Sequence, residues 1–171
     1  MYTYRPKRRN KTALLLTAVL TLIFASGLIC AGFAGSFRYL LEFLSVSSGA
    51  GALLIAGRYL LKDYVYLIRE NDLEYDFIVV ERQGKRRKTV CRIGVSEIKG
   101  IVRETPQNRK ALSARRKGMK QLNYCVDLGR CDSVYLFLTE DGTETAIRFS
   151  PDETLESILK MLSSQGEEQH R

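Results

Sequence analysis

The sequence contains a single histidine, His170, the second-to-last of its 171 residues. A histidine in a polar tail makes a poor general base, because catalysis needs the imidazole held in a fixed hydrogen-bonding geometry. The signatures G-x-S-x-G, H-E-x-x-H and G-x-x-x-x-G-K-[ST], which mark hydrolases, metalloproteases and phosphate loops, are also absent. We therefore expect a protein that is not an enzyme and that uses no cofactor.

The four cysteines contain no C-x-x-C pair; they are Cys30, Cys91, Cys125 and Cys131. A zinc site or a thioredoxin-like redox site therefore has no support in the sequence. Free thiols are the favoured state of these residues, with a disulfide such as Cys125–Cys131 as the alternative.

Charge is missing from two stretches near the N-terminus, residues 12–37 and residues 43–57. A bilayer core of about 30 Å needs a helix of roughly 20 apolar residues. The sequence therefore predicts a transmembrane hairpin over residues 12–61, with spans at about 12–34 and 40–61. Glu42 and Arg58 fall near the two interfaces, where the long arginine side chain can reach the headgroups.

The topology follows from the basic residues on either side of this hairpin. Five lysines and arginines lie within residues 1–11, which we predict to be a basic cytoplasmic tail, and the segment after the second span is also basic. The connecting loop carries only Arg38. Because cytoplasmic flanks are rich in Lys and Arg, we expect a two-span protein of the cell membrane with both termini in the cytoplasm.

Three other interpretations of the first span fit less well. A cleaved signal peptide is disfavoured by the length of the uncharged run and by the lack of a clean A-x-A site. Cys30 is a poor lipoprotein cysteine, because Ile29 stands where a small residue is needed. Arg8-Arg9 lacks the flanking pattern of a twin-arginine signal.

Small residues recur at intervals of four on both predicted spans. Gly27, Ala31 and Gly35 form one row, and Ser48, Ala52 and Ala56 form the other. Such rows allow helix backbones to approach closely in lipid. We expect them to pack the hairpin against itself, with a homo-oligomer through the same faces as the alternative.

From Tyr64 onward the apolar residues alternate with a period of two, which is typical of strands. About seven strands are predicted. They comprise residues 64–70, 73–79 and 86–95, a short fourth strand that follows a bend within residues 94–102, and residues 122–128, 134–139 and 143–149. Turn residues separate several of them, at Asn71-Asp72, Gln83-Gly84 and Asp141-Gly142. Residues 105–121 break the alternation and are predicted to be a loop.

The last predicted element is an amphipathic helix. Ser150 is placed as its N-cap, Pro151 as its first residue and Glu153 as the capping-box acid. An apolar stripe along the helix must be covered by the sheet; it consists of Leu155, Ile158, Leu159 and Leu162. The domain is predicted to span residues 64–163, followed by a polar tail at 164–171.

This order of elements resembles the pleckstrin-homology (PH)-like domains of small bacterial membrane proteins, in which one or two spans precede the domain. The segments that carry the resemblance are Leu73-Glu-Tyr-Asp-Phe-Ile-Val-Val, Gly84-Lys-Arg-Arg-Lys, Val95-Ser-Glu-Ile-Lys-Gly-Ile and Ile147-Arg-Phe-Ser-Pro-Asp-Glu. The resemblance implies an α+β domain of antiparallel strands in a curled barrel, capped by the C-terminal helix. It does not imply one function, because the scaffold serves lipid, peptide and protein binding.

Two basic clusters are the sharpest functional feature. The candidate binding residues are Lys85, Arg86, Arg87 and Lys88 in one cluster and Arg109, Lys110, Arg115, Arg116, Lys117 and Lys120 in the other. We expect the clusters to meet at the open end of the barrel and to face the anionic inner leaflet, where each cation contributes about 1 kcal/mol. Solvated charge is the alternative. Nucleic acid is not expected as a partner, because aromatic residues are not interleaved with the cations.

Together these features predict a membrane-anchored, non-enzymatic binding or scaffold module. Its cytoplasmic PH-like domain is expected to engage a protein partner or anionic lipid headgroups. The alternative is an accessory subunit of a larger transport or envelope complex in the membrane.

Overall fold

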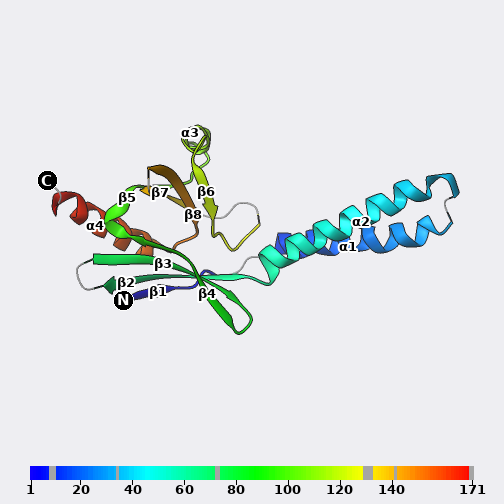
Figure 1. Cartoon of the computed structure of the whole chain (residues 1–171), viewed down its shortest axis with the longest axis horizontal. Helices are drawn as coiled ribbons and strands as arrows, with labels where there is room; N and C mark the ends of the chain where they lie inside the picture. Colours follow the sequence, from blue (N-terminus) through cyan, green and yellow to red (C-terminus); the bar gives the residue numbers. More distant parts are fainter. Residues whose placement is uncertain (8–10, 34, 72–73, 129–132, 141, 170–171) are drawn as a thin grey trace. The chain divides into compact units, whose positions relative to one another are not determined.

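A computed structural model of the chain describes residues 1–7, 11–33, 35–71, 74–128, 133–140 and 142–169. These residues fall into two compact units. One unit contains the two long helices α1 and α2. The other contains eight strands, the short helix α3 and the C-terminal helix α4 (Figure 1).

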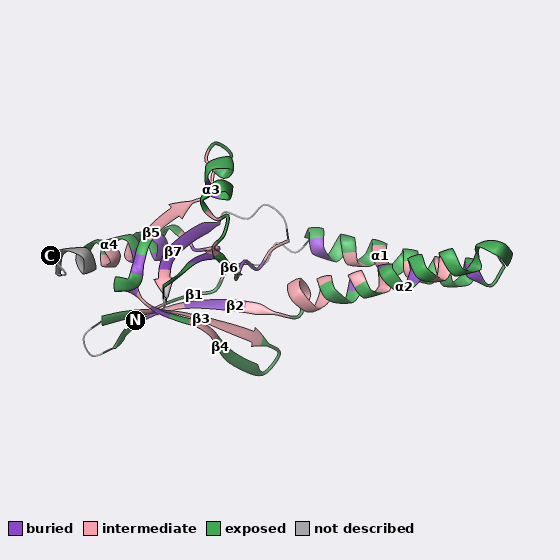
Figure 2. Ribbon diagram, turned by 45° about the horizontal axis from the view of Figure 1, so that its top comes forward, coloured by how far each residue is buried: buried purple, intermediate pink, exposed green. Residues whose placement is uncertain are grey.

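The helical unit consists of α1 (Lys11–Ala31), the turn η1 (Gly35–Phe37), α2 (Arg38–Ile55) and the π-helical turn η2 (Ala56–Leu60). Both long helices are long and apolar enough to cross a membrane. Their large apolar side chains are exposed (Figure 2): Leu22 is 69 %, Phe43 73 % and Leu53 77 % exposed. A helix in the core of a soluble protein would bury such side chains.

Small residues line the contact between α1 and α2. A Cβ atom on Gly27 would lie 2.1 Å from Oγ of Ser45, and Ser45 itself is fully buried. Ala31 and Ala52 are also buried. These contacts agree with the interpretation that the small residues pack the hairpin against itself. Gly35 is the exception, because it lies in the turn with a φ of 47° rather than in the helical row.

The first sheet contains an N-terminal strand that the sequence did not predict. The sheet has the order β1-β2-β3-β4; these strands are β1 (Tyr2–Tyr4), β2 (Asp63–Asn71), β3 (Glu74–Gln83) and β4 (Arg86–Gly94). Strand β1 is antiparallel to β2, with Tyr2 opposite Ile68 and Tyr4 opposite Tyr66. Residues 1–11 are thus not simply a basic tail. Their first residues form a strand that pairs with β2, although β2 follows the hairpin in the sequence.

The second sheet has the order β5-β7-β8-β6 and is not purely antiparallel. Its strands are β5 (Ile98–Arg103), β6 (Lys120–Asn123), β7 (Val134–Glu140) and β8 (Thr143–Phe149). β6 pairs with β8 in parallel, and the strand predicted over residues 122–128 already ends at Asn123. Gly142 has a φ of 76° in the short turn between β7 and β8, whereas Asp141, like Asp72 of the predicted turn after β2, lies outside the described residues.

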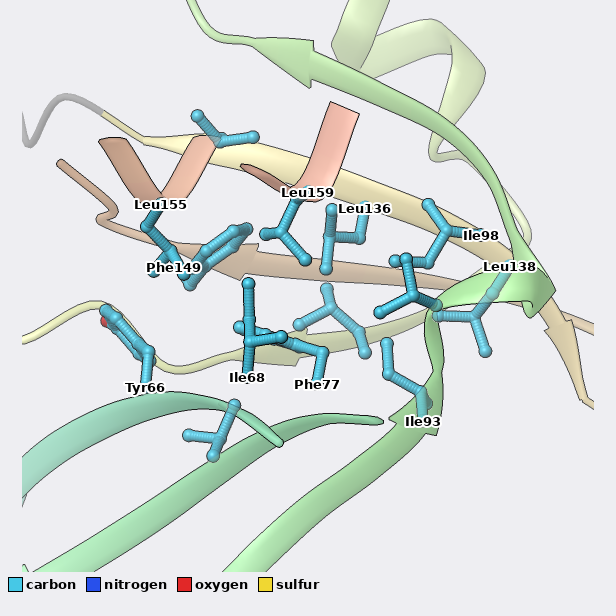
Figure 3. Packing of buried hydrophobic residues seen from close by; sticks show 14 of the residues in the cluster. Tyr66, Ile68, Phe77, Ile93, Ile98, Leu136, Leu138, Phe149, Leu155 and Leu159 are labelled. Carbon is cyan, nitrogen blue, oxygen red and sulfur yellow. The ribbon is translucent and has the colours of Figure 1, made fainter. Parts of the chain in front are cut away.

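The described strands form two separate four-stranded sheets and not the closed barrel that the resemblance implied. The 3-10 turn η3 (Val95–Glu97) separates β4 from β5 and carries the chain from the first sheet to the second. The core lies between the sheets (Figure 3), where Phe77 and Ile68 of the first sheet face Leu136 and Phe149 of the second. The fold is a two-layer sandwich.

Helix α4 (Glu153–Gln169) packs onto this core through Leu155 and Leu159, which are fully buried, as the apolar stripe predicted. The predicted N-cap is wrong, because the helix begins two residues later. Oδ1 of Asp152 accepts the backbone N–H of Leu155 at 3.0 Å and acts as the cap. Ser150 is engaged elsewhere: its hydroxyl donates to Sγ of Cys125, and its amide donates to the hydroxyl of Tyr66.

Candidate functional site

The first basic cluster lies on the turn between β3 and β4. Gly84 adopts a φ of 58°, the left-handed conformation that glycine allows without strain, and Gln83 pairs with Arg86 across the turn. The side chains of Lys85, Arg86, Arg87 and Lys88 are all exposed. None of these side chains makes a hydrogen bond or ion pair with a described residue. We call these four residues the cationic turn.

The position of the cationic turn follows from the topology of the first sheet. Neighbouring strands β2 and β3 are joined by residues 72–73 only, and such a short connection requires antiparallel strands. The end of β3 therefore lies beside the start of β2 at Asp63. Strand β1 also ends toward this edge, because it is antiparallel to β2. The cationic turn thus lies at the end of the sheet where the chain connects to α1 and α2.

The second basic cluster contains a helix where the sequence predicted a loop. Helix α3 (Arg109–Arg115) follows a polar turn in which Asn108 Oδ1 accepts the amide of Thr105 at 2.8 Å, and Asn108 Nδ2 donates to the carbonyl of Arg103. Leu112 is 3 % exposed and packs on the outer face of the second sheet. One well-placed leucine thus holds an otherwise polar helix against the domain.

The arginines of this cluster contact aromatic rings of β7. The guanidinium carbon of Arg115 lies 4.1 Å from the ring centroid of Phe137, and that of Arg116 lies 4.5 Å from the ring centroid of Tyr135. The two rings are themselves stacked, with centroids 6.4 Å apart. A guanidinium over a ring face is attracted by the ring quadrupole, so these contacts add to the attachment of α3.

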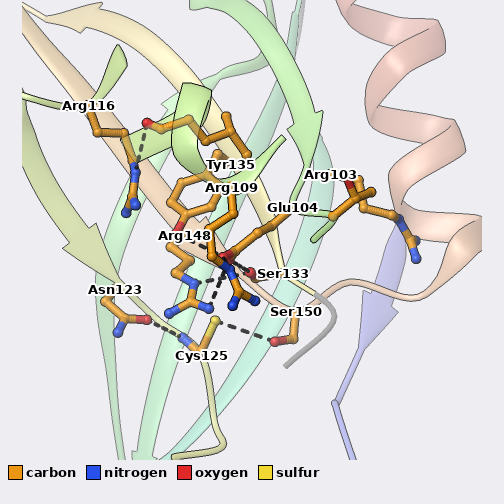
Figure 4. A network of polar contacts seen from close by, with 12 residues as sticks. Arg103, Glu104, Arg109, Arg116, Asn123, Cys125, Ser133, Tyr135, Arg148 and Ser150 are labelled. Carbon is orange, nitrogen blue, oxygen red and sulfur yellow. Dashed lines mark hydrogen bonds and ion pairs between the residues drawn. The ribbon is translucent and has the colours of Figure 1, made fainter. Parts of the chain in front are cut away.

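A partly buried carboxylate, that of Glu104, connects α3 to the sheet. Glu104 accepts Arg109 at 2.9 Å on one oxygen and both Arg148 (3.0 Å) and Ser133 (2.7 Å) on the other (Figure 4). Burial alone raises the pKa of the Glu104 carboxyl, but the hydrogen bonds of Ser133 and Arg109 and the charges of Arg148 and Arg109 outweigh it. The pKa of Glu104 therefore lies below its ordinary value.

A second carboxylate of this kind, Glu156, joins α4 to β5. It accepts Arg103 and Lys160, the latter at 2.7 Å. Burial raises the pKa of Glu156, but the hydrogen bonds from Lys160 and Arg103 and the charges of both outweigh this effect and lower it. The sequence analysis did not single out Glu104, Arg148 or Glu156. Their sequence signal is weak, because each is one charged residue among many.

The two basic clusters do not meet. Figures 1 and 2 show the β3–β4 turn and α3 on opposite sides of the sandwich. They differ in role as well. Arg109, Arg115 and Arg116 contact the domain itself, whereas the side chains of Lys110, Lys117 and Lys120 are exposed and make no hydrogen bond or ion pair with a described residue. The predicted single basic surface is therefore two surfaces.

Little in the described residues points to metal or redox chemistry. No group of three or more His, Cys, Asp or Glu side chains that could hold a metal ion occurs among them. Cys125 is buried, while Cys131 and His170 lie outside the described part of the chain.

A two-layer β domain with a packed C-terminal helix and exposed basic surfaces defines a PH-like fold, a class of domains that generally lack catalysis. The chain belongs to the family described as "Bacterial PH-like domain (DUF6106)", whose model matches residues 5–166. The match includes both long helices, strands β2 to β8 and most of α4. Neither the curated proteins nor the solved structures contain a significant match to this chain.

Proposed function

We propose that the protein is a membrane-anchored binding module whose PH-like domain contacts anionic lipid headgroups through the cationic turn. The observation that carries the proposal is the turn itself, in which the side chains of four adjacent cations are exposed and make no hydrogen bond or ion pair with a described residue. The strand partner of Lys88 is the acid Glu81, whereas Arg86 and Arg87 lie opposite Gln83 and Arg82. The side chains of the cationic turn make no ion pair with a described acid of the domain, so their charges remain available to an external anionic partner. An anionic surface contributes about 1 kcal/mol for each lysine or arginine.

The exposed apolar side chains of α1 and α2 support the membrane anchor. Strand β1 supports a hairpin rather than a cleaved signal peptide. Because β1 precedes α1 and pairs with β2 after α2, the chain must leave the domain and return to the same side. Cleavage after the first span would also remove β1 from its sheet. The basic flanks favour the cytoplasm as the side that holds the domain.

Chain connectivity supports contact between the cationic turn and the bilayer. Only Leu61 and Lys62 separate η2 from β2, and two residues span at most about 7 Å. The end of the first sheet that carries the cationic turn is therefore also the end tethered to the proposed second span. A tether of this length gives the turn a high effective concentration at the surface, so weak attraction is sufficient.

The test uses the full chain in nanodiscs, because a fragment that starts at residue 64 lacks β1. A spin label on lipid headgroups broadens the amide signals of nearby residues. We expect broadening of residues 83–89 in discs with phosphatidylglycerol at low salt, and less broadening at high salt or in pure phosphatidylcholine discs. Equal broadening in the two lipid compositions at low salt would overturn the proposal.

A pair of charge-matched variants locates the contact. The triple variant K85Q/R86Q/K88Q removes three charges from the cationic turn, and K110Q/K117Q/K120Q removes three from the other cluster. Loss of broadening in the first variant alone supports the turn as the contact. Loss of the same size in both variants would show a net-charge effect and would contradict it.

An open groove on the hairpin favours a second candidate function, an accessory subunit of a larger membrane complex. The groove measures about 450 Å³ and is apolar, with Phe24 of α1 and Val46, Ala50 and Leu53 of α2 among its lining residues. Another transmembrane helix could fill it. In-cell crosslinking from a photoreactive residue at position 50 would test this function, and capture of lipid alone would count against it.

A further inference from the structure

We infer that Arg115 is a phosphate-contact residue that takes an exposed phosphomonoester headgroup, a ligand class distinct from the general negative charge attracted by the cationic turn. The inference rests on the proposed lipid contact and adds a second, chemically selective one. It concerns a different surface of the domain, on α3 and the outer face of the second sheet.

The second sheet holds the Arg115 guanidinium in a fixed position without a ligand. The guanidinium lies 4.1 Å over Phe137, which pairs with Gly100 on the neighbouring strand β5. A Cβ atom at Gly100 would lie 3.8 Å from the Nη2 atom of Arg115, an ordinary van der Waals distance, so the guanidinium lies directly above this part of the sheet. An arginine stacked on a ring keeps its N–H donors in the plane, directed away from the ring face.

The donors of Arg115 are unused within the described part of the chain, unlike those of its neighbours. Arg109 gives its donors to Glu104, and Arg116 donates to the carbonyl of Leu112 and to Gln121. The side chain of Arg115 is exposed and makes no hydrogen bond or ion pair with a described residue. Its guanidinium N–H groups are therefore held in place and are available to an external acceptor. Two phosphate oxygens can accept two parallel N–H groups of a guanidinium in a bidentate pair.

The surrounding charge favours a ligand with more than one negative charge. No acidic residue occurs from Thr105 to Gln121, and the exposed Lys110 and Lys117 lie on the same short segment. A phosphomonoester carries about 1.5 to 2 negative charges at neutral pH, whereas a phosphodiester carries one. The monoester also offers three terminal oxygens, two of which match the donor fork of Arg115.

Anchoring of α3 does not require Arg115. Leu112 is buried beneath the helix, Arg109 is paired with Glu104, and Arg116 lies over Tyr135. Replacing Arg115 therefore leaves three attachments of the helix in place. A loss of ligand binding in such a variant can be separated from a loss of structure.

The experiment follows the side-chain Nε–Hε signal of Arg115 in the full chain, held in zwitterionic micelles. The probes are short-chain phosphatidic acid, short-chain phosphatidylglycerol and water-soluble glycerol 3-phosphate. We expect phosphatidic acid to shift the signal at lower concentration than phosphatidylglycerol. A lipid source predicts that phosphatidic acid is also more effective than glycerol 3-phosphate, whereas equal potency of these two would assign the site to a free phosphate ester.

Matched variants then separate geometry from charge. Arg115→Gln should weaken phosphatidic acid binding, followed in the variants by the backbone amide signals of α3, about tenfold, which corresponds to the loss of one charge-assisted contact. Arg115→Lys, which keeps the charge but loses the fork, should weaken it nearly as much. The control Lys110→Gln removes one charge from the same helix and should change the affinity less than about twofold. Equal losses in Arg115→Gln and Lys110→Gln, or full binding by Arg115→Lys, would overturn the inference.

The outcome is distinguishable from failure of the proposed function. The triple variant K85Q/R86Q/K88Q should reduce contact with all anionic lipids while the Arg115 signal still responds to phosphatidic acid. If Arg115→Gln leaves phosphatidic acid binding unchanged while the triple variant abolishes lipid contact, the proposed function stands and this inference fails. Unchanged amide dispersion in each variant excludes unfolding as the cause.

Discussion

The hydroxyl of Tyr2 donates a hydrogen bond of 2.6 Å to Oδ2 of Asp152, the residue that caps the C-terminal helix. The second residue of the chain is thereby fixed to the start of its last helix. Tyr4 reinforces the attachment, because its ring stacks on Tyr66 with centroids 6.3 Å apart. Strand β1 is thus part of the domain, although both helices of the hairpin intervene in the sequence.

Replacing Tyr4 with alanine should destabilise the domain by about 1 kcal/mol, because it removes an aromatic pair at the edge of the core. Tyr2→Phe should also lower stability, since it leaves Asp152 without this donor. Chemical denaturation of the full chain in micelles, followed by the amide signals of the domain, measures both effects. The control is Thr3→Ala, an exposed position on the same strand. Equal stabilities of Tyr4→Ala and Thr3→Ala would contradict a structural role of β1.

Acidification should destabilise the domain through Glu104 and Glu156. Their pKa values in the folded protein lie below the ordinary value of 4.5, so the folded state binds these protons more weakly than the unfolded state. The stability that these ion pairs supply is complete above pH 4.5 and is lost as the pH falls through the lowered pKa values. Denaturation midpoints should therefore stay nearly constant from pH 7 to about pH 5 and decrease as the pH is lowered from 4.5 to 3.

The double variant E104Q/E156Q provides the control for this pH dependence. It should be less stable than the parent at pH 7, by about 3 kcal/mol in total if each carboxylate contributes about 1.5 kcal/mol, as a hydrogen bond to a charged group does. Its stability should also change less between pH 5 and pH 3. Parallel pH profiles of parent and variant would show that other carboxylates cause the acid sensitivity.

Local patterning was sufficient for the elements whose signals lie within one segment. The stripe of Leu155 and Leu159, the Gln83-Gly84 turn and the β7 and β8 strands all follow from short-range periodicity or turn chemistry, and the structure contains them. Strand β1 could not be predicted in this way. Its three residues have too little pattern of their own, and its partner β2 lies about sixty residues away in the sequence.

The candidate site shows the same limit. Exposure of Lys85–Lys88 follows from their run of charge on a tight turn. The distance between the two clusters does not, because it depends on how the two sheets pack. Within the second cluster, the helix depends on Leu112 reaching Tyr135 and Phe137, and a contact between distant segments leaves no local sequence signal. The capping error at Ser150 has a similar cause, because Cys125 and Tyr66 occupy that residue.

The close contact of Gly27 with Ser45 predicts the cost of a side chain within the hairpin. Gly27→Ala should destabilise helix association by about 1 to 3 kcal/mol, because the new Cβ would overlap Ser45 Oγ. The double variant G27A/S45G should recover most of this loss. Gly57→Ala is the control, because a Cβ atom at Gly57 would have no neighbour within 4 Å. Thermal stability of the purified chain in micelles provides the measurement, and equal effects of the two alanines would contradict this packing.

Cysteine labelling tests the proposed two-span topology with both termini on one side. In a background without native cysteines, Ser36→Cys places a thiol in the exposed turn between the helices, and Lys85→Cys places one in the cationic turn. A membrane-impermeant maleimide should label position 36 in intact cells and position 85 only after permeabilisation, because an out-and-back hairpin separates the two sites by a bilayer. Labelling of both positions in intact cells would place the domain outside the cytoplasm. Labelling of position 85 alone would invert the hairpin and remove the cationic turn from the inner leaflet.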